Sequence, residues 1–405
     1  MKSIKRNKYD YMLTVMVLLM IFGQFGSALQ AVRVYILALF PFMFINAING
    51  KHAKLEYYKY ECIFVTTWVV FSIAFLYKSI ELIESIKHVA YIIIHGIGFL
   101  EILWLACKSN KPQESLIKGW IGLIILTIPI AVTEFFTGFH LPTTLHEDIY
   151  ILKVGGVDIE RPFAAVSYGN LNAYNTLLCC SMPSLFIFSL YSKRKIDFAL
   201  SIFLLISITL IIIANASRAS ILCLGMCLMT YFFTYMKIGK NKKTLITLFA
   251  LAVFVLSFYL IDMFTLILER FDDQGMSDDG RSENIIKGLQ ALVDSYGLGI
   301  GIGNYAPIMG NIYNVLIPAP HNLFIEVIVV SGVIVFIGFM LLLIRIIGFG
   351  LRGEERNKIA LTIGMVALIF TSIIDSNYVM NFRTWLFISS LYILTDSHYN
   401  LKYKA

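Results

Sequence analysis

Charged residues are scarce in this chain: lysine, arginine, aspartate and glutamate make up only 15% of its 405 residues, while 58% are hydrophobic. Soluble domains usually carry about 25% charged residues. No soluble core needs this much apolar surface, so the composition predicts a polytopic membrane protein. The formal net charge of +7 could suggest nucleic acid as a partner. Basic residues beside apolar runs instead follow the positive-inside rule, and no nucleic-acid partner is expected.

Signatures of metal and hydrolase chemistry are also lacking. No Ser-His-Asp set, metalloprotease motif, internal repeat or low-complexity stretch is present. All six cysteines fall inside apolar segments, and Cys223 and Cys227 share a helix face without the further ligands that a metal needs. The pairs Asp272-Asp273 and Asp278-Asp279 could bind a divalent cation, but solvated loop acids are the preferred interpretation. We therefore assign no disulfide, metal or cofactor.

Hydrophobic runs of near-spanning length predict about twelve transmembrane helices. The basic N-terminus resembles a signal peptide, but its apolar run is long and a second run follows at once, which favours a retained first span. The expected spans are 11–29, 34–49, 61–77, 89–107, 119–136, 163–191, 197–214, 219–236, 244–264, 321–349, 359–374 and 384–395.

Alternating these spans from a cytosolic N-terminus places both termini in the cytosol. The cytosolic segments then hold 22 of the 33 lysine and arginine residues, 18 of them lysine. Arg345 lies near the cytosolic end of its span, where it can snorkel. This agreement with the positive-inside rule supports the topology. The expected cytosolic segments are 1–10, 50–60, 108–118, 192–196, 237–243, 350–358 and 396–405.

Arginine dominates on the opposite face, where six of ten basic residues are arginine. Guanidinium forks suit phosphate better than ammonium groups do. This asymmetry indicates a site for a phosphorylated lipid on the outer side of the membrane. The six residues are Arg33, Arg161, Arg218, Arg270, Arg281 and Arg383.

One outer loop, 265–320, is large enough for a small subdomain within the single integral membrane domain 1–405. Residues 281–293 predict an amphipathic helix with one apolar stripe, followed by a glycine stop at Gly297. The stripe comprises Ile285, Ile286, Leu289, Leu292 and Val293. The alternating glycines 297–303 superficially look like a dinucleotide fingerprint, but no βαβ unit can surround them, so they predict a flexible turn.

Three arginines beside this loop are candidate anion ligands, each with a simpler alternative. Arg218, in Ser217-Arg218-Ala219-Ser220, could be an interfacial anchor. Arg281 opens the loop helix, and a helix N-terminus beside an arginine can bind an anion. Arg281 and Arg270 could instead form surface salt bridges with the many nearby acids.

The loop ends in Pro320-His321-Asn322, with Glu326 inside the following apolar run. A histidine at an interface is usually a polar belt residue, yet one near its reference pKa could act as a base or hold an acceptor hydroxyl. A glutamate inside a span is costly and suggests function. Five residues is about 500° of helix rotation, so pairing between His321 and Glu326 is not implied.

Polar residues also interrupt the apolar stretch that follows Arg161. The run 169–174 contains Gly169, Asn170 and Asn172, which indicates a broken helix, a cavity lining or a re-entrant turn. His95 and Glu101, in the fourth span, could form a buried polar pair or line a cavity.

The ordered set of these stretches resembles the O-antigen ligase and O-antigen polymerase superfamily of bacterial surface-polysaccharide enzymes. The resemblance covers about 160–350, and the first 150 residues add only membrane topology. The matching stretches are 161–175 (RPFAAVSYGNLNAYN), Ser217-Arg218-Ala219, Gly280-Arg281 with 297–305 (GLGIGIGNY), and His321-Asn322 leading to Ser331-Gly332.

The resemblance implies an all-α, GT-C-like glycosyltransferase that is metal-independent and uses a glycan on undecaprenyl diphosphate as donor. It implies that Arg218 and Arg281 hold the diphosphate and that His321 positions or deprotonates the acceptor hydroxyl. The other implied partners are a glycan or lipid-linked acceptor, membrane lipids and a chain-length regulator. The further candidates for substrate binding are Arg161, Arg270, Asn172, Asn322 and Glu326.

The expected reaction is an inverting transfer that polymerises O-antigen or capsule repeat units. A ligase that transfers glycan to the lipid A core of lipopolysaccharide is the alternative within the family. A flippase for lipid-linked oligosaccharides is the alternative from another class, but flippases typically alternate access between pseudo-symmetric halves, and this sequence shows no halves.

Overall fold

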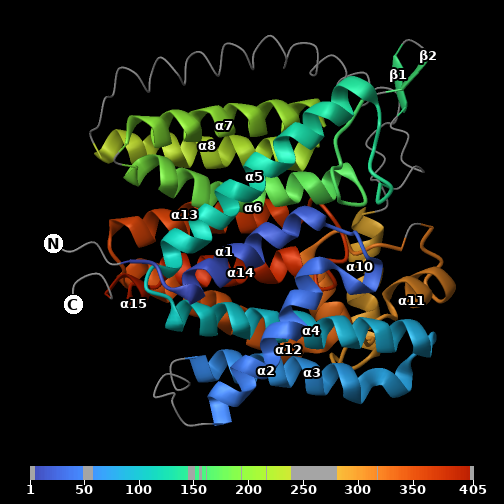
Figure 1. The fold of residues 1–405 in the computed structure, drawn as a ribbon. Helices are drawn as coiled ribbons and strands as arrows, with labels where there is room; N and C mark the ends of the chain where they lie inside the picture. The colour runs from blue at the N-terminus through green and yellow to red at the C-terminus, as the bar shows by residue number, and fades with distance from the viewer. Residues whose placement is uncertain are drawn as a thin grey trace.

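Helix α14 (Phe382–Thr395) is buried along its whole length inside a bundle of helices. The computed structural model describes residues 5–48, 58–144, 151–154, 157–160, 162–192, 194–215, 217–238, 281–316 and 318–401. In Figure 1, helices α7 (Lys195–Ala214) and α8 (Arg218–Ile238) form one edge of the bundle. Helices α2 (Ala31–Ile48) and α3 (Lys59–Ala74) form the opposite edge, and α14 lies between the two.

The described chain is almost entirely helical. A short hairpin pairs strands β1 (Ile151–Val154) and β2 (Val157–Glu160) antiparallel. Short 3-10 helices are η1 (Leu19–Phe22), η2 (Ser27–Leu29) and η4 (Phe75–Lys78). The remaining α-helices are α1 (Lys8–Leu18), α4 (Leu82–Lys108), α5 (Pro112–Thr137), α6 (Leu171–Tyr191), α10 (Arg281–Asp294), α11 (Tyr305–Asn311), α12 (Leu323–Arg352), α13 (Glu355–Thr371) and α15 (His398–Leu401).

Seven of the described helices are long and apolar enough to cross a membrane, which makes the chain a polytopic membrane protein. Helices occupy eleven of the twelve ranges expected from hydropathy, and the remaining range, 244–264, lies outside the described residues. The total of twelve spans therefore stays a prediction. The seven are α2, α3 with η4, α4, α5, α6, α7 and α12.

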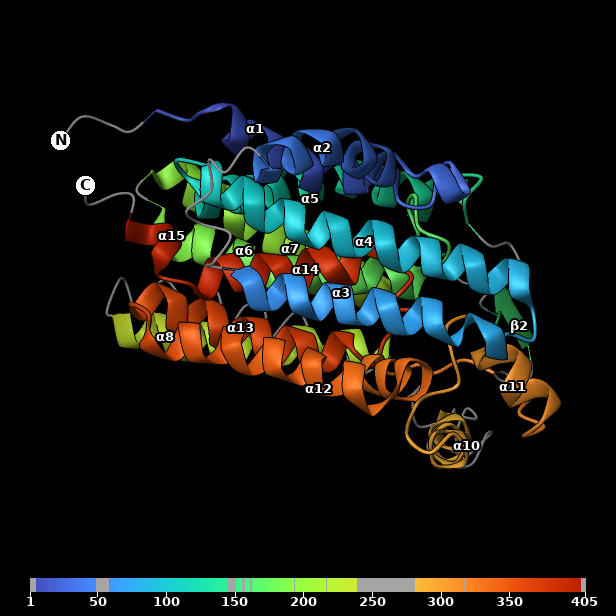
Figure 2. The ribbon, with the colours of Figure 1, turned by 90° about the horizontal axis from the view of Figure 1, so that it is seen from below.

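The two ends of the bundle differ. Figure 2 shows the N- and C-termini at one end, and α10, α11 and strand β2 at the other. We call the latter the loop end. Helices α1 and α15, near the two ends of the described chain, thus lie at the end of the bundle opposite the loop end.

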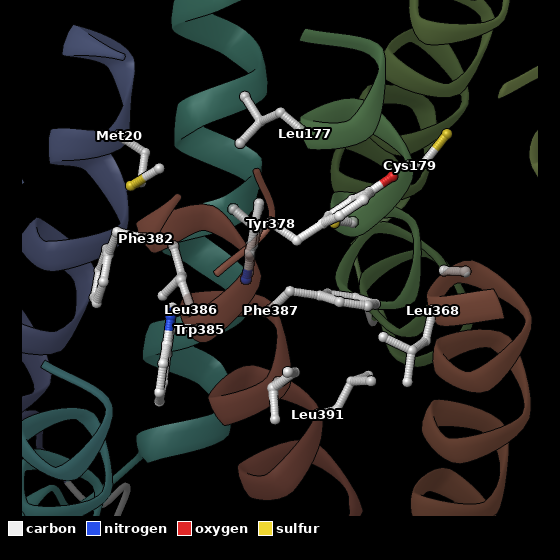
Figure 3. Close-up of a cluster of buried hydrophobic side chains, with 14 of the residues drawn as sticks. Met20, Leu177, Cys179, Leu368, Tyr378, Phe382, Trp385, Leu386, Phe387 and Leu391 are labelled. Carbon is white, nitrogen blue, oxygen red and sulfur yellow. The ribbon is translucent and has the colours of Figure 1, made fainter. Parts of the chain in front are cut away.

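Helix α14 is too short to cross a bilayer alone, because its 14 residues rise only about 21 Å. It packs against α4, α5, α6, α12 and α13, so its ends meet protein rather than lipid. Figure 3 shows Phe382, Trp385 and Leu391 of α14 within the central cluster of buried side chains. The indoles of Trp385 and Trp68 pack with ring centroids 4.9 Å apart.

The first expected span, 11–29, is not one continuous helix. α1 ends at Leu18, and the chain then turns at Gly23, which has φ 45°. The N–H of Gln24 donates to the carbonyl of Ser167 (2.8 Å), and the Tyr168 hydroxyl donates to the carbonyl of Met20 (2.6 Å). The expectation of a continuous span was wrong because these contacts with a distant segment replace the helical hydrogen bonds.

Helix α12 is interrupted at Gly332, where φ is 82° and ψ is 172°. Essentially only glycine adopts this conformation. The carbonyls of Val329 and Val330 accept hydrogen bonds from the N–H groups of Ile300 (2.9 Å) and Gly301 (3.0 Å). Non-helical backbone at membrane depth is tolerated where protein satisfies its polar groups, and these two bonds do so here.

The glycine run 297–303, predicted to be a flexible turn, packs closely against this interruption. All four of its glycines have positive φ. A Cβ on Gly299 would lie 2.6 Å from the nitrogen of Gly332, and one on Gly303 would lie 2.7 Å from the hydroxyl of Ser85. The turn is confirmed, but the glycines serve close backbone approach.

Arg345, predicted to snorkel toward the cytosol, forms an ion pair within the bundle. Its Nε lies 2.8 Å from Oε1 of Glu61, whose side chain is fully buried. The guanidinium also lies over the rings of Tyr60 and Phe349, with centroids at 5.1 and 4.9 Å. The pair joins α12 to α3 and supplies the partner that a charge at membrane depth requires.

Glu61→Ala is expected to lower the free energy of unfolding by about 3 kcal/mol, because it leaves the Arg345 charge without its partner. The double variant Glu61→Leu/Arg345→Met should recover most of the loss, since a well-packed apolar pair can replace a buried ion pair. Unfolding in mixed detergent micelles measures both effects. The control is Glu84→Ala, which breaks an exposed pair with Lys87 and should cost less than about 1 kcal/mol. Equal losses for the two alanine variants would contradict the prediction.

Candidate functional site

His321 and Asn322 lie at the loop end, where α12 begins. The Asn322 side chain accepts hydrogen bonds from the N–H groups of Phe324 (2.9 Å) and Ile325 (3.1 Å), so it caps the helix. The N–H of Leu323 donates to the carbonyl of Ser372 (2.9 Å). Asparagine favours this cap because its oxygen satisfies otherwise unpaired N–H groups of the first turn. The predicted ligand Asn322 thus fixes the position of its neighbour.

His321 adopts a strained backbone conformation just before this cap. Its φ is 40°, a left-handed value that is uncommon for a residue with a Cβ. Its side chain is half-buried. Strained residues of this kind cluster at functional sites, where surrounding contacts hold them. Here the cap and the bond to Ser372 provide those contacts on one side.

The loop helix predicted over 281–293 is confirmed as α10, which starts at Arg281 and ends at Asp294. The predicted glycine stop is also present. The N–H of Gly297, which has φ 75°, donates to the carbonyl of Leu292 (2.9 Å). The Arg281 backbone is described and its side chain is not.

Asn284 ties the first turn of α10 to the segment that leads into His321. Its side chain is buried, and its oxygen accepts a hydrogen bond from the N–H of Ala319 (3.1 Å). Its carbonyl accepts one from the Tyr305 hydroxyl (3.1 Å). Arg281 precedes Asn284 by about one helical turn, or about 5 Å of rise, and His321 follows Ala319 by two residues. The structure therefore brings the Arg281 and His321 positions into the same region.

Arg218 begins α8 at the loop end, and its side chain is exposed. The neighbouring Ser217 hydroxyl accepts a hydrogen bond from the Ser220 hydroxyl (2.8 Å) within the first turn. Arg218 thus shares an end of the bundle with His321 but lies on a different helix. Arg161 and Arg270 lie outside the described residues.

The stretch expected to be a helix from residue 163 is irregular up to residue 170, and α6 begins only at Leu171. Asn170 caps α6 by accepting from the N–H of Ala173 (2.8 Å). The predicted ligand Asn172 lies in the first turn with a half-buried side chain. The backbone is irregular where the polar residues interrupt the apolar stretch, and the expected start of the span at residue 163 was wrong.

Buried Glu134 holds this irregular segment. Its Oε2 accepts hydrogen bonds from the N–H groups of Ala165 and Val166, both at 2.8 Å. Its Oε1 lies 3.6 Å from Nδ1 of His140, whose ring stacks on Phe163 with centroids 4.3 Å apart. The carboxylate thereby supplies partners for backbone groups that a helix would otherwise satisfy.

Asn215 supports the same segment from the end of α7. It accepts from the N–H of Ala164 (2.8 Å), and its amide donates to the carbonyl of Ala164 (3.0 Å) and to Asn175 (2.8 Å). Neither Glu134 nor Asn215 was predicted from the sequence. Both could have been found by the signal that singled out Glu326, which is a polar side chain within or at the end of an apolar run.

Glu326, in the first turn of α12, plays a comparable role. It is buried, and its two carboxylate oxygens accept hydrogen bonds from the N–H groups of Tyr378 (2.8 Å) and Val379 (3.0 Å). These residues belong to the connection between α13 and α14. Glu326 therefore anchors a loop-end segment to α12, and its carboxylate is occupied by backbone groups.

Two of the outer arginines predicted from the sequence are buried beside the same connection. The guanidinium of Arg383 pairs with Asp375 (2.5 Å) and donates to the carbonyl of Ala173. Arg383 thus links the α13–α14 connection to the start of α6, close to Asn172. Its side chain therefore stabilises the packing of these two segments at the loop end.

Arg33 makes the other buried contact. Its Nε donates to the ring of His95 (3.1 Å), another nitrogen donates to the carbonyl of Met380 (3.2 Å), and the guanidinium lies 3.8 Å from the centroid of Tyr91. His95 is therefore paired with Arg33 rather than with Glu101, a pairing that the sequence offered as one of two alternatives. Both side chains contact the α13–α14 connection, Arg33 at the carbonyl of Met380 and His95 at that of Val379.

Metal binding finds no support in the part of the chain that the structure describes, which contains no group of three or more His, Cys, Asp or Glu side chains placed to hold an ion. The loop acids Asp272, Asp273, Asp278 and Asp279 lie outside that part.

Comparisons with known proteins give two matches to this chain. Residues 200–340 match the family model described as O-Antigen ligase. That range contains Arg218, Arg281, His321 and Glu326, together with α10 and the interruption of α12. A second match is to the teichuronic acid biosynthesis protein TuaE of Bacillus subtilis (strain 168), which is 20% identical over 350 residues, or 81% of this chain and 70% of the relative. The two matches confirm the resemblance to the O-antigen ligase and polymerase superfamily.

Proposed function

We propose that this protein is an inverting glycosyltransferase that polymerises surface-polysaccharide repeat units carried on undecaprenyl diphosphate. The observation that carries the proposal is the link from Asn284 to Ala319, which brings the start of α10 beside the strained His321. This link lies within the stretch that matches the O-antigen ligase model. A cation and a potential base in one region are what a transfer from a diphosphate requires.

In the proposed reaction, the acceptor hydroxyl attacks the anomeric carbon of the donor glycan. A bond forms from the acceptor oxygen to that carbon while the bond from the carbon to the diphosphate oxygen breaks. The acceptor proton passes to a ring nitrogen of His321, and undecaprenyl diphosphate leaves with the bonding electron pair. Arg281 and Arg218 stabilise the negative charge that develops on the diphosphate, so the step needs no metal.

The other predicted ligands are proposed either to contact the substrate or to position residues that do. Arg161, Arg270 and Asn172 are proposed to contact the substrate. Asn322 and Glu326 act through the backbone as positioning residues, because their side-chain oxygens already accept backbone hydrogen bonds.

The wider setting is also part of the proposal. The chain forms a single integral membrane domain with a GT-C-like fold of twelve spans, and 265–320 forms an extracytoplasmic subdomain. Both termini are cytosolic, and the loop end faces the exterior of the bacterial cytoplasmic membrane. The relative's name refers to teichuronic acid biosynthesis, which supports a surface polysaccharide as the product class. The description O-Antigen ligase supports the alternative of transfer to a final acceptor.

Deletion of the gene, with and without complementation, tests the proposed function. Lipid-linked and surface glycans separated on a gel are expected to lose their ladder and to retain a single repeat, because no second repeat is added. Long polymer stranded on undecaprenyl diphosphate would indicate the ligase instead. Single repeats trapped on the cytosolic leaflet would overturn the enzyme proposal and indicate a flippase.

A further inference from the structure

Helix α10 has an inward side that packs on the bundle. The residues on this side are Asn284, Gly288, Ala291 and Leu292, of which Asn284, Ala291 and Leu292 are 1%, 3% and 8% exposed. A Cβ on Gly288 would lie 3.4 Å from a methyl carbon of Val329 in α12. Of the five members of the predicted apolar stripe, only Leu292 is fully buried on this side.

Ile285 of the predicted stripe is half-buried, and its three remaining members form an exposed apolar side. Ile286, Leu289 and Val293 are 63%, 40% and 73% exposed. At about 100° of rotation per residue, these three fall within a sector of about 60°. Tyr296, just beyond the helix, is 93% exposed. Three apolar side chains on one narrow sector need a partner other than water.

A third side of α10 is polar. Glu283, Lys287, Gln290 and Asp294 occupy the sector that begins where the apolar one ends, at about 100° of rotation per residue. The helix therefore divides its circumference into a protein-facing, an apolar and a polar side. A helix that packs on the surface of a globular protein has only two sides, an apolar one that faces the core and a polar one that faces solvent. The exposed apolar side of α10 is therefore an additional feature.

The orientation of α10 accounts for its exposed apolar side. Figure 2 shows α10 end-on, whereas α3, α4 and α12 are seen from the side, so α10 runs across the direction of the spans. Its contact at Val329 lies six residues into α12, or about 9 Å along that helix. Amphipathic helices at a membrane interface bury their apolar side about 5–10 Å deep and lie parallel to the surface.

The adjoining surface of α12 is apolar and exposed as well. Val333, Ile334 and Ile337 are 37%, 51% and 52% exposed, and Gly297 at the end of α10 packs on Val333. These residues lie in a span, where exposed apolar side chains face lipid. The apolar side of α10 thus continues a lipid-facing surface.

We infer that α10 is an interfacial helix whose apolar side, Ile286, Leu289 and Val293, docks into the acyl-chain boundary of the leaflet at the loop end. Its polar side then faces water, and Tyr296 sits at headgroup level, where amphipathic aromatic rings are favoured. The occupant is the phospholipid bilayer itself. The inference does not depend on the proposed reaction, because it rests on the helix faces and their orientation alone.

Tryptophan quenching by lipid tests this docking. Ile286→Trp, Val293→Trp and the matched control Gln290→Trp are placed in nanodiscs of phosphatidylcholine brominated near the headgroup end of the acyl chains. The four native tryptophans are at most 5% exposed, so the added residue supplies the accessible signal. Quenching at 286 and 293 is expected to exceed that at 290 by about two-fold or more. Iodide in the aqueous phase should quench in the reverse order.

Two outcomes would overturn the inference. Weak lipid quenching at all three positions would mean that water or another protein surface covers the apolar side, and the iodide result would distinguish these two. Equally strong lipid quenching at all three would mean that the helix is submerged rather than docked by one side. Size-exclusion profiles identical to the parent protein confirm that each variant is folded before the comparison.

Discussion

Gly332→Ala is expected to lower the free energy of unfolding by about 3 kcal/mol or more, and much of the protein should fail to accumulate in the membrane. The backbone at Gly332 (φ 82°, ψ 172°) is accessible essentially to glycine alone. A Cβ there would also collide with the carbonyl oxygen of Leu298. Relief requires separating the run 297–303 from α12, which leaves the carbonyls of Val329 and Val330 without their partners. Membrane yield and unfolding in mixed micelles measure the effect.

The matched control lies in the same helix. A Cβ on Gly348 meets nothing within 4 Å, so Gly348→Ala should leave stability unchanged or raise it by up to about 1 kcal/mol through helix propensity. A Gly332→Ala variant with the yield and stability of Gly348→Ala would show that the interruption of α12 is not a fixed feature of the fold.

Arg281→Ala and His321→Ala are each expected to reduce glycan transfer by about 100-fold or more at normal membrane levels. For Arg281 the loss reflects removal of positive charge from the leaving diphosphate. For His321 it reflects removal of the proton acceptor. Arg281→Lys should restore only part of the activity, because an ammonium keeps the charge but lacks the two-pronged geometry of guanidinium. Conversion of lipid-linked repeats to polymer by membranes of each strain provides the measurement.

Two controls remove similar side chains outside the proposed site. Lys287→Ala takes a cation from the polar side of α10, and His88→Ala takes a half-buried histidine from α4. Both should retain activity within a few-fold. Activity of Arg281→Ala or His321→Ala equal to that of its control would remove the residue from the mechanism and leave the other assignment standing.

Local sequence signals predicted much of the fold. Apolar runs gave helices in every expected range that the structure describes, and the periodicity of 281–293 with the following glycine gave α10 and its end. These features depend on residues close together in the chain, because helix hydrogen bonds and glycine stops are local. The same local rules also indicated that polar residues before α6 break the helix.

The candidate site was predicted only in part. The sequence placed His321 at the start of a span and Arg281 at the start of a helix, and the structure shows α12 beginning two residues after His321 and α10 beginning at Arg281. It did not show that Asn284 would join them through Ala319, since that hydrogen bond spans 35 residues. The Arg281 side chain, Arg161 and Arg270 lie outside the described side chains, so their roles stay predictions.

The sequence by itself determined that this is a polytopic helical membrane protein with an amphipathic loop helix, because bilayer thickness and helix periodicity act on contiguous residues. Only the tertiary structure decided what the polar residues inside the spans do. Glu134 and Glu326 each accept two backbone N–H groups from a distant segment, and Gly332 opens α12 to residues about 30 positions earlier. Irregular backbone in a membrane must find partners wherever the fold supplies them, and no local pattern records which residues those will be.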